Sequence, residues 1–215
     1  MRRLVLDGEA RLSVVAIGAH PDDIEIGCGG TLLRLGAERR LGPVRWAILT
    51  GEEPRRTEAA ASARAFVPPG TELDLRHGTF TDGYLPERYG DVKRFLHELA
   101  TGPAPDVVFT PRREDAHQDH RLLAELAPTV FRDALILEYE IPKSDGDLGI
   151  VNAYVELSGE LLARKVELLL AQFPSQRDRS WFTEETFRAL PRLRGIEALA
   201  SSGYAEGFVA RKLVL

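Results

Sequence analysis

The chain has 215 residues, of which 44% are hydrophobic, and it carries a formal net charge of −5. This length and composition predict one domain over residues 1–215, and the negative charge excludes a general nucleic-acid-binding surface. The single cysteine, Cys28, excludes an intramolecular disulfide and is typical of a reducing compartment. Because no apolar run is long enough for a signal peptide or a membrane span, we expect a cytoplasmic protein without integral membrane association.

Short β-rich segments alternate with longer helical ones along most of the chain. Strands are predicted at 13–19, 44–50, 71–77, 106–110 and 134–140, and helices at 24–40, 55–66, 91–100, 117–131 and 158–173. Two further short helices are predicted at 183–190 and 194–202, and an exposed loop at 142–149. The alternation predicts an α/β fold, Rossmann-like and doubly wound, with a mostly parallel sheet flanked by helices and a C-terminal helical portion.

The first strand runs directly into a histidine and two aspartates. In the segment VVAIGAHPDD (14–23), His20, Asp22 and Asp23 follow a strand that should end before Pro21, which cannot donate a backbone hydrogen bond. The carboxylates therefore lie near the N-terminus of the next helix, whose dipole favours anions by about 1 kcal/mol at most. That is too little to offset the desolvation of two acids beside a core, so a bound cation is the better explanation.

A second polar cluster follows the fourth predicted strand in the same way. The segment EDAHQDHR (114–121) comes directly after 106–110, and His117 and His120 share one face of the helix that begins there. Asp119 lies close enough in sequence to support an imidazole. In open α/β sheets, sites assemble beyond the carboxyl ends of strands where the strand order reverses, so we expect the two clusters to converge.

Imidazole nitrogens with one carboxylate oxygen are typical ligands of Zn²⁺, and three protein ligands with one open position are typical of catalytic zinc. Fe²⁺ and Co²⁺ suit the same donors. A zinc-bound water has a pKa of about 7, and hydrolysis would further need a base and donors for the oxyanion. Taken singly, the acids could be helix caps and the histidines a solvated helix face or core groups. The occurrence of both clusters after strands favours a metal site.

The motifs AHPDDIE (19–25) and HQDH (117–120) together resemble those of the PIG-L/LmbE-like family of zinc-dependent N-deacetylases. Three further segments are similar to family members, namely DGYL (82–85), PSQ (174–176) and YAEGF (204–208). The resemblance implies a hydrolase with one Zn²⁺ per chain. It also implies that the substrate is a small molecule, an N-acetylated amino sugar that loses its acetyl group.

Carried over by motif position, the resemblance assigns His20, Asp23 and His120 as the metal ligands. Asp22 would be the general base that deprotonates the water. His117 would be an imidazolium beside the amide carbonyl and would stabilise the oxyanion.

The same resemblance implies that Asp119 holds the imidazole of His117, and that Arg55 and Asp82 bind hydroxyl groups of the sugar. The segment LTGEEPRR (49–56) departs from the family pattern T-x-G-E followed by several residues. We therefore expect a differently shaped rim next to the sugar.

Two other functions remain open from the sequence. One is a zinc hydrolase of another amide or of an ester, and the other is a non-catalytic α/β module that binds a sugar or a nucleotide. The complete set of ligands, base and oxyanion donor favours an enzyme, because a binding module needs no such set. The sequence also leaves open whether the C-terminal helices close over the substrate or form a contact in a homo-oligomer.

Overall fold

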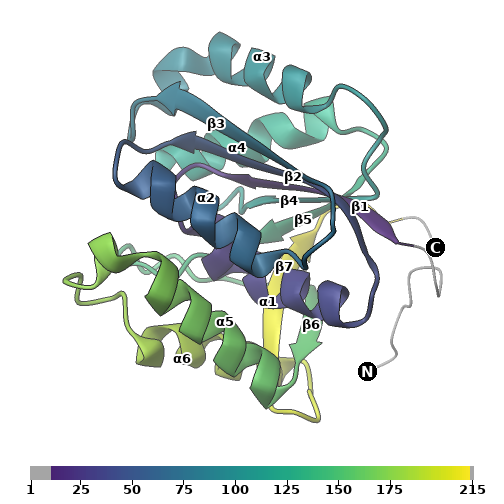
Figure 1. The fold of residues 1–215 in the computed structure, drawn as a ribbon, viewed down its shortest axis with the longest axis vertical. Coiled ribbons are helices and arrows are strands. Elements are labelled where there is room, and N and C mark those ends of the chain that lie inside the picture. Colours follow the sequence, from purple (N-terminus) through teal and green to yellow (C-terminus); the bar gives the residue numbers. More distant parts are fainter. Residues whose placement is uncertain (1–10, 214–215) are drawn as a thin grey trace.

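The computed structural model of the protein describes residues 11–213, which are built around one mixed sheet (Figure 1). The strands are β1 (Leu12–Gly18), β2 (Leu41–Thr50), β3 (Leu73–Phe80), β4 (Val107–Pro111), β5 (Leu135–Tyr139), β6 (Ala153–Leu157) and β7 (Tyr204–Ala210). They lie in the order β3-β2-β1-β4-β5-β7-β6. Strands β1 to β5 pair in parallel, whereas β7 is antiparallel to both of its neighbours.

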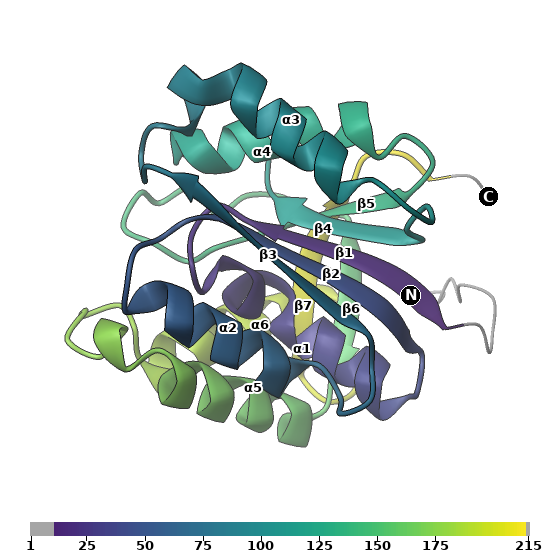
Figure 2. The same cartoon turned by 45° about the horizontal axis from the view of Figure 1, so that its top comes forward.

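Helices cover both faces of this sheet. They are α1 (Asp23–Ala37), α2 (Arg55–Phe66), α3 (Tyr89–Leu99), α4 (Gln118–Val130), α5 (Gly159–Gln172) and α6 (Glu184–Glu197), with short 3₁₀ turns η1 (Leu85–Arg88) and η2 (Pro174–Gln176). Helices α3 and α4 lie on one face, and α1, α2, α5 and α6 lie on the other (Figure 2). The predicted α/β class, with a mostly parallel sheet and C-terminal helices, is confirmed.

The central strand β1 shows why the sequence folds in this way. Residues Val14 to Ile17 are fully buried because helices cover both faces of the strand. A strand buried on both faces needs apolar side chains at successive positions, which explains the continuous apolar run. On one side β1 pairs with β2, and on the other side it pairs with β4. The chain order thus reverses between β1 and β4, which makes their carboxyl ends the switch point of the sheet.

The C-terminal part differs from the sequence prediction in two respects. Strands β6 and β7 were not predicted, and the two short helices expected at 183–190 and 194–202 are one helix, α6. Helix α6 continues through Pro191, which is buried with Phe187 and Arg194 against the sheet. This tertiary packing outweighs the backbone hydrogen bond that a proline removes from a helix.

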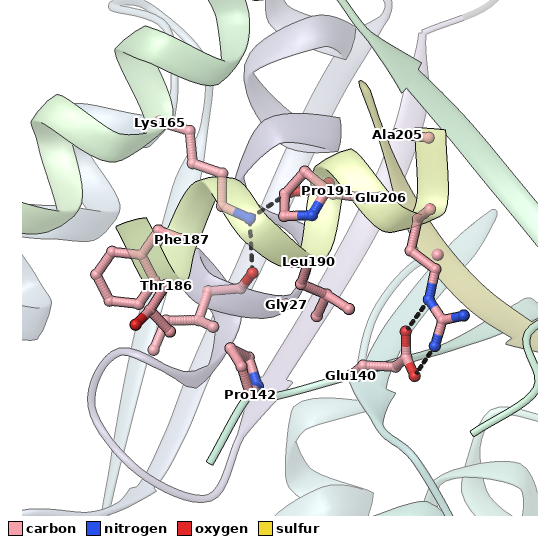
Figure 3. Close-up of a pocket in the computed structure, with 13 residues that line it drawn as sticks. Gly27, Glu140, Pro142, Lys165, Thr186, Phe187, Leu190, Pro191, Ala205 and Glu206 are labelled. Carbon is pink, nitrogen blue, oxygen red and sulfur yellow. Dashed lines mark hydrogen bonds and ion pairs between the residues drawn. The ribbon is translucent and has the colours of Figure 1, made fainter. Parts of the chain in front are cut away.

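Strand β7 brings a buried glutamate against the middle of helix α1. Oε1 of Glu206 accepts hydrogen bonds from the backbone N–H of Gly30 (2.8 Å) and from Nζ of Lys165 (2.7 Å). Its Oε2 accepts hydrogen bonds from the backbone N–H (2.7 Å) and the hydroxyl (2.6 Å) of Thr31, and Lys165 also donates to the carbonyl of Ile26 (2.6 Å). We call these five residues the lysine cluster; Lys165 and Glu206 line a small cavity beside α6 (Figure 3).

None of the helices within residues 11–213 combines the length and the apolar character needed to cross a membrane. The prediction of a single domain includes residues 1–10 and 214–215, which lie outside the described residues, and it stays a prediction.

Candidate metal and catalytic site

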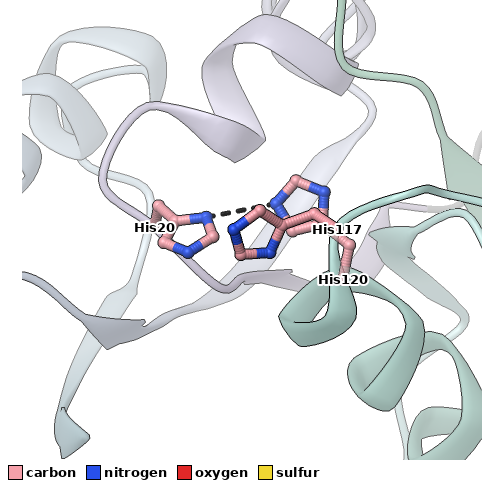
Figure 4. Close-up of side chains that lie close together, drawn as sticks. All are labelled: His20, His117 and His120. Atoms are coloured by element: carbon pink, nitrogen blue, oxygen red, sulfur yellow. Dashed lines mark hydrogen bonds between the residues drawn. The ribbon is translucent and has the colours of Figure 1, made fainter. Parts of the chain in front are cut away.

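The two polar clusters meet at the switch point of the sheet. The first occupies the connection from β1 to α1, and the second occupies the connection from β4 to α4. The ring of His20, in the first connection, lies close to the rings of His117 and His120 at the start of α4 (Figure 4). Their centroids are 4.7 to 5.1 Å apart. The structure therefore brings together residues that lie about a hundred positions apart in the chain.

Three ligand-type atoms form a compact triangle within this cluster. Nδ1 of His20 lies 3.1 Å from Nε2 of His120, and Oδ2 of Asp23 lies 3.2 Å from that Nε2 and 3.5 Å from that Nδ1. Donor atoms placed about 2.0–2.1 Å from a tetrahedral Zn²⁺ are about 3.3 Å apart, so the separations fit such an ion. We call these three atoms the ligand triangle.

The local chain conformation aims Asp23 into the triangle. The backbone N–H of His20 donates a 2.8 Å hydrogen bond to Oδ2 of Asp23, whose own N–H points back to the carbonyl of His20. Burial alone would raise the pKa of Asp23, but His120 and His20 outweigh it and hold that pKa well below its ordinary value. Burial likewise opposes protonation of His120, yet the nearby Asp23 carboxylate raises its pKa to about 9. A carboxylate held this firmly in its charged form can take a cation.

Other side chains around His20 could also hold a metal. The three histidines form one such group, and His20, Asp82, His117 and Asp119 form another, with ligand atoms within 4.8 Å of one another. Asp82 lies 2.9 Å from Nε2 of His20, the nitrogen outside the ligand triangle. Its side chain is 64% exposed, which places Asp82 at the rim of the site.

Asp22 lies beside the ligand triangle in a strained backbone conformation. It precedes α1 with φ of 95°, a left-handed conformation that Asp adopts more readily than most residues. Its Oδ2 accepts a 2.9 Å hydrogen bond from Arg55, which also donates to the carbonyl of Pro21. Burial raises the pKa of Asp22 to about 7, although Arg55 opposes the shift. Arg55 therefore contacts Asp22 in this structure, whereas the resemblance implies a contact with the sugar.

Asp119 has different contacts from those that the resemblance implies. Its carboxylate accepts hydrogen bonds from the backbone N–H groups of Gly83 (2.7 Å) and Leu85 (3.0 Å), and Oδ2 lies 3.4 Å from Nε2 of His20. The contact between Asp119 and the ring of His117 is made by the backbone N–H of Asp119, which donates to Nδ1 of His117 (3.3 Å). Asp119 thus ties the loop between β3 and η1 (81–84), which we call the Asp82 loop, to the start of α4.

The sequence prediction missed Asp115, which contacts two histidines of the second cluster. Its Oδ2 lies 3.0 Å from Nδ1 of His120, and its Oδ1 accepts a hydrogen bond from the N–H of His117. Burial would raise its pKa, but His120 and a lysine lower it to about 2. The sequence has two adjacent acids here, Glu114 and Asp115, and it does not indicate which of them faces the site. Glu114 pairs with Arg211 at the surface.

Comparison with known proteins identifies the class of this site. The chain is 30% identical over 152 residues, which cover 66% of it and 80% of the relative, to the uncharacterized deacetylase YaiS of Escherichia coli K12. Its fold matches the conserved protein TT1542 of Thermus thermophilus, with a TM-score of 0.72, 26% identity, and coverage of 95% and 96% of the two chains.

A third similar structure is the N,N'-diacetylchitobiose deacetylase of Pyrococcus horikoshii, with a TM-score of 0.66 at 23% identity over 91% of this chain and 82% of that one. At this identity the likeness shows the fold. Fold, site and relatives together define the class: a metal-dependent deacetylase, which is a hydrolase of amide bonds. Residues 15–131 match the family model described as PIG-L, GlcNAc-PI de-N-acetylase, and the chain belongs to this family. The predicted resemblance is confirmed.

Proposed function

We propose that the protein is a zinc-dependent N-deacetylase that removes the acetyl group from an N-acetylated amino sugar of the N-acetylglucosamine type. The observation that carries this proposal is the ligand triangle of His20, Asp23 and His120 with the buried acid Asp22 beside it. The separations within the triangle suit a tetrahedral ion with one position left open for the reaction.

In this proposal His20, Asp23 and His120 hold the ion. A bound Zn²⁺ would polarise the amide carbonyl and make a water molecule acidic enough to lose a proton near neutral pH. Asp23 contributes the single negative charge of the ligand set, and burial excludes competing solvent from its carboxylate. Because Fe²⁺ and Co²⁺ accept the same nitrogen and oxygen donors, we include both ions in the test.

Asp22 acts as the general base. Its carboxylate takes a proton from the attacking water and returns it to the nitrogen of the amino sugar as the C–N bond breaks and acetate forms. Burial raises the pKa of Asp22 in the metal-free protein, and a buried carboxylate is a better acceptor for a proton than one in water, so the same group can accept the proton and return it. Arg55 keeps the carboxylate in place by its hydrogen bond to Oδ2.

His117 stabilises the oxyanion. Its Nδ1 accepts the backbone N–H of Asp119, so the proton of the neutral ring lies on Nε2. In the neutral ring and in the imidazolium alike, Nε2–H is a donor for the carbonyl oxygen as negative charge develops on it. The hydrogen bonds from Gly83 and Leu85 to the Asp119 carboxylate hold this end of α4 in register with the Asp82 loop.

The sugar lies at the rim formed by Asp82 and Arg55. The exposed carboxylate of Asp82 can accept hydrogen bonds from sugar hydroxyls, and Arg55 has a partly exposed guanidinium that can donate to them. The names of similar proteins support this substrate class, because the family is that of GlcNAc-PI de-N-acetylase and the Pyrococcus protein is an N,N'-diacetylchitobiose deacetylase.

A substrate panel tests the proposal. Protein loaded with Zn²⁺, Fe²⁺ or Co²⁺ is incubated with N-acetylglucosamine conjugates, and mass spectrometry measures the loss of the acetyl group. We expect deacetylation that stops when a chelator removes the metal and returns when the metal is restored. Activity that survives complete metal removal would refute the mechanism.

Two further measurements separate the alternative functions. A panel of acetyl esters and other amides is run in parallel, and hydrolysis of these without hydrolysis of any N-acetyl sugar would refute the substrate class. Binding of an amino sugar at full affinity by metal-free protein, with no turnover by the metal-loaded form, would indicate a non-catalytic module.

A further inference from the structure

A buried carboxylate lies between the start of helix α4 and the β5–β6 loop (140–152). Asp115 is 3% exposed, and its Oδ1 accepts a 2.8 Å hydrogen bond from the backbone N–H of His117. Its Oδ2 lies 3.0 Å from Nδ1 of His120, the nitrogen of that ring that does not belong to the ligand triangle. A carboxylate this close to the second nitrogen of a metal-binding imidazole is the usual kind of group that fixes the orientation of such a ring.

Asp115 is held in turn by a lysine of the β5–β6 loop. Nζ of Lys143 lies 2.8 Å from Oδ2 of Asp115 and 2.5 Å from Oδ2 of Asp147. Asp147 also accepts a 2.6 Å hydrogen bond from the backbone N–H of Ala116. Since the side chain of Lys143 is only 15% exposed, its charge is screened less than that of a surface lysine.

Other contacts keep the β5–β6 loop in place independently of Lys143. Arg112 donates to the carbonyl of Asp147, and Arg194 donates to the carbonyl of Gly149 at 2.8 Å. Arg194 is itself fixed by two hydrogen bonds to the carboxylate of Glu140. Replacing Lys143 therefore removes its charge from Asp115 without freeing the loop.

We propose that Asp115 and Lys143 are positioning residues of the metal site: Asp115 orients the imidazole of His120 so that Nε2 faces the ion, and Lys143 holds Asp115 there from the β5–β6 loop. The inference rests on the proposed metal site. It extends that site from the ends of β1 and β4 to a third segment of the chain.

Metal binding measures this role directly. Metal-free wild type, Asp115→Asn and Asp115→Ala are titrated with Zn²⁺ in competition with a chromophoric chelator, and the visible absorption spectrum of the Co²⁺ form is recorded. We expect Asp115→Ala to lower metal affinity about 10- to 100-fold, as is usual for such a partner of a metal-binding histidine, and to change the Co²⁺ spectrum. Asp115→Asn, which keeps an oxygen acceptor, should give a smaller loss.

Lys143 is tested by a matched series. Lys143→Met should lower metal affinity, but by less than Asp115→Ala does. Lys143→Arg keeps the positive charge and should retain most of the wild-type affinity. Lys93→Met in α3 removes a lysine from another part of the molecule and should leave both the affinity and the Co²⁺ spectrum unchanged. Circular dichroism of the metal-free variants shows that each one is folded, and Lys143→Met carries the test if Asp115→Ala is not.

Two outcomes overturn different statements. If wild type binds one metal and deacetylates, yet folded Asp115 and Lys143 variants keep its metal affinity and its Co²⁺ spectrum, the positioning role is refuted and the proposed function stands. If wild type takes up no metal, and His120→Ala changes neither metal content nor activity, the proposed function itself is refuted.

Discussion

Helix α1 joins two buried polar clusters of opposite character. In the lysine cluster at its middle, Glu206 meets the ammonium of Lys165 and three further donors, and the ammonium also meets a carbonyl. At its N-terminus, two imidazole nitrogens and a carboxylate oxygen of the ligand triangle converge within 3.1 to 3.5 Å. Without a shared proton or a cation, these three atoms are all acceptors facing one another.

The comparison separates structural from functional burial of charge. A buried cluster in which each charge meets its opposite stabilises one arrangement of the chain. A buried cluster that needs a further ion or proton is incomplete by itself, and such sites are where a protein binds and reacts. Changes in the lysine cluster should therefore lower the free energy of unfolding. Changes in the ligand triangle or in Asp22 should affect metal binding and turnover.

The largest effect is expected for Asp22→Asn. Loss of the proposed general base should lower kcat about 10²- to 10⁴-fold, because the proton transfer from water would lose its acceptor. Asn tolerates the left-handed conformation at this position, so the fold and the metal content should be preserved. Steady-state kinetics with metal analysis by mass spectrometry measure both. Asp133→Asn at the surface is the control, and an undiminished kcat in Asp22→Asn would refute the role of the base.

Lys165→Met tests whether the lysine cluster contributes to stability and not to metal binding. It leaves the buried Glu206 carboxylate without its cation, which should cost about 3–5 kcal/mol in the free energy of unfolding. Metal affinity at the ligand triangle should be unchanged. Urea unfolding measures the first quantity and chelator competition the second, with Lys93→Met as the control. A variant that unfolds like wild type but loses metal would reverse the assignment of the two clusters.

Gly27→Ala tests the helix surface between the clusters. A Cβ atom on Gly27 would lie 2.1 Å from Cδ2 of Tyr139, a fully buried ring whose hydroxyl donates to the carbonyl of Ile17. Overpacking of this kind should cost about 1–3 kcal/mol in the free energy of unfolding. Gly90→Ala in α3, where a Cβ would meet nothing within 4 Å, is the matched control. Equal stability of the two variants would contradict the close packing of α1.

The smallest effect concerns the titration of Asp22. Burial raises its pKa from 3.8 to about 7 in the folded protein, and Arg55 limits the increase, so Arg55→Gln should raise the pKa further. Between pH 4 and 7 the carboxyl group of Asp22 binds more protons in the folded than in the unfolded state, so its contribution to the free energy of unfolding of metal-free protein should fall as the pH rises. In Arg55→Gln this fall should continue to higher pH.

Carboxyl ¹³C NMR of metal-free protein follows the Asp22 titration, and urea unfolding as a function of pH follows its effect on stability. Asp22→Asn is the control, because it lacks this contribution. A pKa that drops in Arg55→Gln would contradict the opposition between burial and the guanidinium.

Much of the parallel part of the fold could be predicted from the sequence. Most of strand β1 is a continuous run of buried Val, Ala and Ile, and helical segments separate the first five strands along the chain. Strand β7 could not be predicted, because Glu206 and Gly207 are residues that strands disfavour. Only the donors on α1 and Lys165, which come from elsewhere in the chain, make a buried glutamate acceptable there.

The site shows the same limit. The motifs marked the side chains that converge at the switch point, because histidines and paired acids after a strand have few structural explanations. Asp115 was not distinguished from Glu114, since only the turn of the chain before α4 decides which acid faces inward. The N–H groups of Gly83 and Leu85 carry no sequence signal at all, because every residue except proline has one.

The large separation in sequence between the two polar clusters of the site has a consequence for how the chain folds. His20 and His120 are 100 positions apart, so the ligand triangle forms only once β4 has paired with β1. Closing such a long loop is entropically costly, and contacts of this range slow folding. An ion that binds only the assembled arrangement lowers the free energy of the native chain, so occupancy by metal and completion of the central sheet become one equilibrium.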